Sequence, residues 1–183
     1  MKRLRVILTG FIYSIAVYLV AQTPCRPVEK ISTDLESGNY ICNSYLRTGG
    51  FDLEYDPQYA LYEELSNCAT SEDLKLLMLE EHPVVQYYAI LAFLVRDADN
   101  AIEFVFEEET MLKQKEVTEF LNYCQGSFKK KILDVLLYQA YRLIVEEKII
   151  MTATNMVKLL QLRDRRNYYE LPRERRHETN KGF

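Results

Sequence analysis

The chain has 183 residues, of which 48% are hydrophobic and 27% are charged. This balance is that of a folded protein, and the length allows one domain with a single core, so the composition excludes an intrinsically disordered chain. Residues 22–162 carry 13 Lys and Arg against 23 Asp and Glu, a net charge of −10, which argues against nucleic acid as a partner.

The N-terminus has the pattern of a secretory signal. Three basic residues in MKRLR precede sixteen uncharged residues, Val6 to Ala21, and we expect residues 1–21 to be removed as a signal peptide. A retained membrane anchor is the alternative, because the uncharged run continues to Cys25 and residues 6–25 approach the ~20 residues that cross a bilayer. Both readings predict an extracytoplasmic chain, periplasmic or secreted, that touches membrane only through this segment when it is not cleaved.

Export gives the cysteines a possible structural role, because disulfides persist outside the cytoplasm. All four follow the signal, and four cysteines allow three pairings among which the sequence does not choose. The alternative is that the cysteines in predicted helices are small buried hydrophobic residues. No pair has the close C-x-x-C spacing of a zinc site, so we expect no metal site. The disulfide candidates are Cys25, Cys42, Cys68 and Cys124.

Capping signals divide the next part of the chain into helices. PVEKISTDLESG, residues 27–38, predicts a short helix, whereas NYICNSYLRTGG, residues 39–50, favours a helical turn over a short strand. Asp56-Pro57 is a capping residue followed by a proline at the first helical position, which predicts a helix to about Asn67. Ser71 is the expected cap of the following helix, and His82-Pro83 ends that helix.

Residues 83–95 have almost no polar side. A helix of about thirteen residues is roughly 20 Å long, too short to cross a bilayer. Because apolar side chains point in all directions, we expect neighbouring helices to cover this helix on more than one side.

Four further helical segments are expected after Asp97. Asn100 with Glu103 predicts a capping box for the first, and Gly126-Ser127 separates the second from the third. Phe128 is expected on the inward side of the third helix, and we see no β-hairpin signal in this region. The segments are residues 100–110, 113–125, 127–147 and 152–163.

The segment Ser71 to Leu94 resembles one unit of the HEAT-like helical repeat family. Its second helix reads P-x-V-x-x-x-A-x-x-A, with Pro83, Val85, Ala89 and Ala92 in the matching positions, and Gln86 where the family has arginine. The resemblance implies stacked helix pairs in which the small alanines allow close approach. The predicted fold class is therefore all-α, either an antiparallel helical bundle or a short HEAT-like right-handed stack of about six to seven helices, preceded by an N-terminal signal or anchor helix.

The expected organisation has four parts. They are the signal peptide or anchor (1–21), an irregular or helical segment (22–55), an all-helical domain (56–163) and a basic tail (164–183).

Residues suited to catalysis are few. The two histidines, His82 at a helix junction and His177 in the charged tail, have no partner motif, and the six glycines form no phosphate-binding pattern. We therefore expect no catalytic residues, no cofactor and no enzymatic activity.

A binding role is the favoured interpretation. Tyrosine is enriched in binding surfaces, and residues 97–119 hold eight acids and two lysines, which would attract a basic protein. The function predicted is an exported helical protein-binding module, such as an adaptor, an envelope assembly factor or an immunity-type inhibitor. A membrane-tethered structural component of the envelope is the alternative, with an enzyme as the third class. The expected partner-binding residues are Gln86, Tyr87, Tyr88, Glu107, Glu108 and Glu109.

Overall fold

The structure is a computed structural model that describes residues 25–42, 46–47, 53–54, 56–120 and 127–165. Residues 1–24 and 166–183, which hold the predicted signal peptide and most of the basic tail, lie outside the described residues, as does Cys124. The described part is mostly helical, as expected, with eight helices where about six to seven were predicted. Among these residues, none of the helices is both long enough and apolar enough to cross a membrane.

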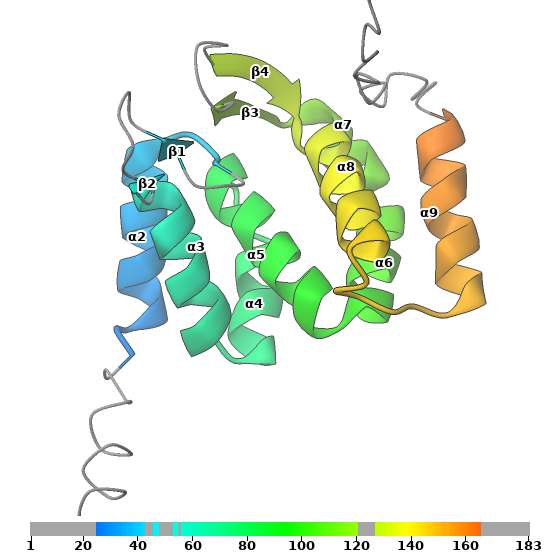
Figure 1. Cartoon of the computed structure of the whole chain (residues 1–183), viewed down its shortest axis with the longest axis horizontal. Coiled ribbons are helices and arrows are strands. Elements are labelled where there is room, and N and C mark those ends of the chain that lie inside the picture. The colour runs from blue at the N-terminus through cyan, green and yellow to red at the C-terminus, as the bar shows by residue number, and fades with distance from the viewer. Residues whose placement is uncertain (1–24, 43–45, 48–52, 55, 121–126, 166–183) are drawn as a thin grey trace, which may run out of the picture.

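The first helices form an antiparallel pair. Helix α2, Val28–Gly38, packs against α3, Pro57–Cys68, and the two-residue strands β1, Leu46–Arg47, and β2, Leu53–Glu54, pair between them in the chain (Figure 1). The strands correct the helical turn expected over residues 39–50. Ile31 and Leu35 of α2 belong to the same core as the later helices, so the N-terminal segment is part of the packed body.

Helix α3 begins as predicted. The Asp56 carboxylate accepts hydrogen bonds from the backbone N–H groups of Gln58 and Tyr59, and Pro57 occupies the first helical position, where a missing N–H costs nothing. Helix α4, Ser71–Leu77, is capped by Thr70 and not by Ser71. Thr70 and Asp73 form a reciprocal capping box, which satisfies two backbone N–H groups at once.

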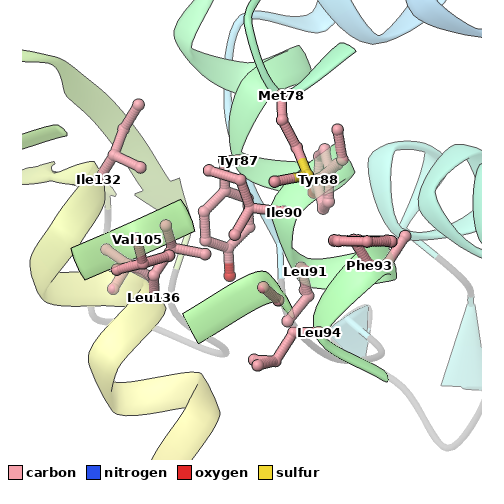
Figure 2. Close-up of a cluster of buried hydrophobic side chains, with 14 of the residues drawn as sticks. Met78, Tyr87, Tyr88, Ile90, Leu91, Phe93, Leu94, Val105, Ile132 and Leu136 are labelled. Atoms are coloured by element: carbon pink, nitrogen blue, oxygen red, sulfur yellow. The ribbon is translucent and has the colours of Figure 1, made fainter. Parts of the chain in front are cut away.

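Helix α5, Pro83–Arg96, is the central element, and the prediction of a buried helix is confirmed. Every residue from Val84 to Leu94 is buried. Helix α5 contacts α2, α3 and α4, and also α6 (Ala98–Glu107), α8 (Ile132–Val145) and strand β3 (Glu116–Phe120). Figure 2 shows its side chains among residues of the flanking helices, including Val105 and Leu136. Because each fully buried Leu, Ile or Phe contributes about 1.5–3 kcal/mol, this helix is the main source of hydrophobic stabilisation.

Helices α6, Ala98–Glu107, and α7, Glu109–Gln114, follow α5. The cap of α6 is Asp97, whose carboxylate accepts a hydrogen bond from the Asn100 backbone N–H, so the Asn100–Glu103 capping box was wrong. The helix α9, Ala153–Arg165, lies beside α6 at the right-hand edge of Figure 1.

A β-hairpin replaces the helix predicted over residues 113–125. Strand β3, Glu116–Phe120, pairs with β4, Ser127–Lys131, in an antiparallel register that places Glu116 opposite Lys131. Val117 and Glu119, two residues apart, are buried, whereas Glu116 is exposed. This period of two is that of a half-buried strand, and the backbone N–H of Ile41 extends the pairing by donating to the Thr118 carbonyl at 2.8 Å.

Because of the hairpin, the next helix begins later in the sequence than predicted. Helix α8, Ile132–Val145, begins five residues later than predicted, and Phe128 is 48% exposed on β4 instead of facing inward.

Candidate functional site

The structure separates the six predicted partner-binding residues into two groups. Gln86, Tyr87 and Tyr88 lie in α5 with 0% exposure, so their side chains form part of the core and do not present a binding surface. The Tyr88 hydroxyl accepts a hydrogen bond from the Cys42 backbone N–H at 2.7 Å and donates one to the Cys42 carbonyl at 3.1 Å. This pair of bonds joins α5 to the segment that follows α2.

Gln86 fills the position where the HEAT-like family has arginine. Its amide nitrogen donates to the Met78 carbonyl at 2.7 Å, which ties α5 to the end of α4. A helix such as α5, which is apolar on nearly all sides, makes few polar side-chain contacts. This contact anchors α5 to α4, the other helix of the pair.

The glutamates form the second group, at the junction of α6 and α7. Glu107 is exposed, whereas Glu109 is half-buried between Lys113 Nζ at 2.5 Å and Arg165 Nη2 at 2.8 Å. Other acids of this run are also used within the chain, because Glu103 pairs with Lys158 and Glu119 pairs with Lys130. Half of the eight acids in this run are therefore paired with the chain's own lysines and arginines.

A pocket of about 550 Å³ opens instead beside the α2–α3 pair, which sequence reasoning missed. Its volume falls in the range of ligand pockets in proteins. It is lined by Arg26, Asp34, Ser37, Gly38, Tyr40, Pro57, Gln58, Ala60, Leu61 and Glu64.

A disulfide and the ion pairs of Arg26 hold the two pocket walls together at one end. A disulfide joins Cys25, just before α2, to Cys68, the last residue of α3. Beside it, Arg26 makes a two-pronged ion pair with Glu64 of α3 and donates from Nη1 to Asp34 Oδ2 of α2 at 2.7 Å. The hydrogen bonds from Arg26 hold the pKa of Glu64 below its usual range and raise the pKa of Arg26.

The other end of the pocket is fixed by hydrogen bonds. The Tyr40 hydroxyl donates to Asp56 Oδ2 at 2.9 Å, and Gln58 Nε2 donates to the Leu35 carbonyl at 3.4 Å. Burial is the main reason that the pKa of Tyr40 is raised, with the bond to Asp56 adding to it. Gly38 is needed here because a Cβ at that position would lie 1.4 Å from Gln58 Nε2.

The side chains that line this pocket use their hydrogen-bond donors and acceptors to different extents. Each lining side chain that can donate does so to a protein acceptor: Arg26 to carboxylates, Ser37 to the Asp34 carbonyl, Tyr40 to Asp56, and Gln58 to the Leu35 carbonyl. Gln58 Oε1, in a side chain that is only 3% exposed, has no hydrogen-bond partner among the residues that the structure describes. The lining also holds two carboxylates against one guanidinium. The pocket is therefore acidic and rich in hydrogen-bond acceptors.

Of the four disulfide candidates, the structure brings together Cys25 and Cys68, whose Cα atoms are 5.5 Å apart. Cys42 is buried, and Cys124 falls outside the described residues. Within the described ranges, no cluster of three or more His, Cys, Asp and Glu is arranged to hold a metal ion.

Comparisons with family models, with curated proteins and with solved structures find no match to this chain.

Proposed function

We propose that this chain is an exported helical module that binds a protein partner through the face formed by α2 and α3. The observation that carries the proposal is the acceptor-rich pocket between two helices that a disulfide and an ion pair hold in fixed positions. A rigid binding face loses little conformational entropy when a partner docks, so more of the contact energy remains as affinity. The α6–α7 junction is the weaker acidic face, because Glu109 already has two cationic partners.

Export is supported by the same disulfide. Disulfides form and persist in oxidising compartments, and Cys25 follows directly on the segment with the signal pattern. Extracytoplasmic location, periplasmic or secreted, is therefore part of the proposal.

The finer architecture that we propose is a short HEAT-like stack of helix pairs instead of a closed antiparallel bundle. Its support is the succession of the pairs α2–α3 and α4–α5 along the chain, with α5 in contact with both α2 and α3. Ala89 and Ala92 of α5 are buried, as close approach of stacked helices requires.

Affinity capture from the exported fraction tests the binding role. We expect the tagged full-length chain, cross-linked before extraction, to retain a specific protein. An Asp34→Lys variant should lose that protein, because it adds a positive charge at the pocket. Glu72→Lys makes the same charge change on α4, away from the pocket, and should retain it. Failure of the unaltered chain to retain any protein would contradict the binding role.

The second candidate function is a membrane-tethered structural component of the envelope. The uncharged run over residues 6–25 favours it. Sequencing the N-terminus of the protein from membrane and soluble fractions separates the two. A chain that begins near Gln22 contradicts tethering, and an intact Met1 in the membrane fraction supports it.

A further inference from the structure

The geometry points to the α2–α3 pocket as a site that receives a basic side chain, lysine or arginine, from the protein partner. This inference rests on the proposed binding function and deepens it by naming the chemistry of the group that is recognised.

The first step is the balance of charge. Asp34 and Glu64 contribute two negative charges to the lining, and Arg26 contributes one positive charge. Asp34 uses Oδ2 for Arg26 and is 41% exposed, so its carboxylate also faces solvent. A cation that enters the pocket therefore meets a net negative charge that the chain itself leaves uncompensated.

The second step is the count of donors and acceptors. The hydroxyls of Ser37 and Tyr40 are directed to protein acceptors, and Glu64 and Asp34 use three of the N–H groups of Arg26, so an incoming carboxylate or phosphate finds few donors. An incoming donor finds acceptors. A buried amide oxygen without a partner is destabilising, so a ligand donor that reaches it after a small movement of the side chain is favoured.

The third step is the orientation of the Gln58 amide. The Leu35 carbonyl, 3.4 Å from Nε2, requires a donor, which fixes the nitrogen on that side and leaves Oε1 as the acceptor without a partner. Gly38 makes this arrangement possible, since any larger residue would displace the amide. The Leu35 carbonyl, the Gln58 amide and the absence of a side chain at Gly38 thus shape the site. None of these three features depends on the acidic charge.

A guanidinium or ammonium group meets all of these requirements. Both are cations with several N–H donors and no acceptor. The volume of about 550 Å³ exceeds one side chain, so the backbone of a short segment around the basic residue also has room. Anionic ligands and nucleic acid are disfavoured by the same charge.

The test is a titration followed by NMR, with the full chain from the exported fraction and its disulfide intact. The probes are three capped tetrapeptides, Gly-Arg-Lys-Gly, Gly-Gln-Asn-Gly and Gly-Glu-Asp-Gly. We expect only the basic peptide to shift the backbone amides of Ser37 and Gly38 and the side-chain amide of Gln58. Asp34→Asn should weaken this binding about fivefold, the size of one partly exposed charge pair.

The matched control is Glu36→Gln. It makes the same change in net charge at an exposed position of the same helix, outside the pocket lining. It should alter binding less than twofold. Equal weakening by both variants, equal binding of the neutral peptide, or shifts that map away from α2 and α3 would each overturn the inference. If the affinity capture above succeeds and Asp34→Asn still retains the partner fully, the pocket inference fails while the binding function stands.

Discussion

Tyr88 shows how a side chain that looks suited to a binding surface is needed inside the molecule. Its ring stacks on Tyr62 with 5.5 Å between ring centres, and its hydroxyl serves both polar groups of the Cys42 backbone. Burial raises the pKa of Tyr88, so the hydroxyl keeps its proton and remains a donor throughout the physiological pH range. At this position, therefore, the tyrosine serves the core and not a binding surface.

Replacing Tyr88 with Phe is expected to destabilise the protein by about 2 kcal/mol. The ring volume is kept, but the buried Cys42 N–H and C=O would each lose the hydrogen bond that the Tyr88 hydroxyl supplies, and loss of a buried hydrogen bond carries a desolvation cost. Urea denaturation followed by circular dichroism measures the change in the free energy of unfolding.

Tyr62→Phe is the control for that measurement. The Tyr62 hydroxyl makes no hydrogen bond within the described part of the chain, and burial is the first cause that raises its pKa to about 12. The loss should stay within about 0.5 kcal/mol. Equal stability of the two variants would show that the bonds to Cys42 contribute nothing.

Among the helices, the start of the C-terminal helix α9 is held by one carboxylate of α6. Asp99, in the first turn of α6, accepts from the Thr152 backbone N–H at 2.9 Å, from its hydroxyl at 2.9 Å and from Asn155 Nδ2 at 2.8 Å. These donors stand at the start of α9, where unpaired backbone N–H groups need acceptors. The bonds from Thr152 and Asn155 lower the pKa of Asp99.

Asp99→Asn is expected to loosen α9 at neutral pH, seen as faster amide hydrogen exchange in α9 and a lower thermal midpoint. Because the folded-state pKa of Asp99 lies below its ordinary value of 3.8, its contribution to stability is present above that value. It disappears as the pH falls through the lower folded-state pKa. The difference between variant and unaltered protein should therefore be full at pH 7 and small near pH 2.

An Asp164→Asn variant serves as the comparison, since Asp164 lies on an exposed part of α9 and its ion pair within the described ranges is with its neighbour Arg163. It should leave exchange and midpoint unchanged at both pH values. A difference between Asp99→Asn and the unaltered protein that persists undiminished near pH 2 would contradict the role of the ionised carboxylate.

Local sequence signals predicted elements well where capping and periodicity agreed. Asp56-Pro57 located the start of α3, and the apolar run after Pro83 identified α5. The hairpin was missed because Val117 and Phe120 also satisfy helical spacing. What selects the strand is pairing with β4 and with Ile41, a contact between residues far apart in sequence that periodicity does not contain.

At the scale of the whole molecule, the candidate site was unreadable in the sequence for the same reason. Arg26 and Glu64 are 38 residues apart, and neither belongs to a recognisable motif. Charge counting instead directed attention to residues 97–119, where the acids are dense but four of the eight form ion pairs with lysines or arginines of the chain. A net charge in sequence predicts a binding surface only when the fold leaves that charge uncompensated.

The Cys25–Cys68 disulfide connects the stability of the molecule to its proposed site, and its removal gives the last prediction. The bridge closes a loop across a sequence separation of 43 residues, and restriction of the unfolded chain by such a loop stabilises the fold by roughly 4 kcal/mol. The double variant Cys25→Ser, Cys68→Ser should unfold at correspondingly lower urea concentration.

A reducing agent gives the internal control for the disulfide prediction. It should shift the unaltered protein to the midpoint of the double variant, because both changes remove the Cys25–Cys68 bridge. Since the bridge also joins the ends of α2 and α3 that carry Arg26 and Glu64, both the reduced protein and the variant should bind the basic tetrapeptide less tightly. An unchanged urea midpoint on reduction would contradict the stabilising role, and unchanged affinity would show that the ion pairs alone position the pocket walls.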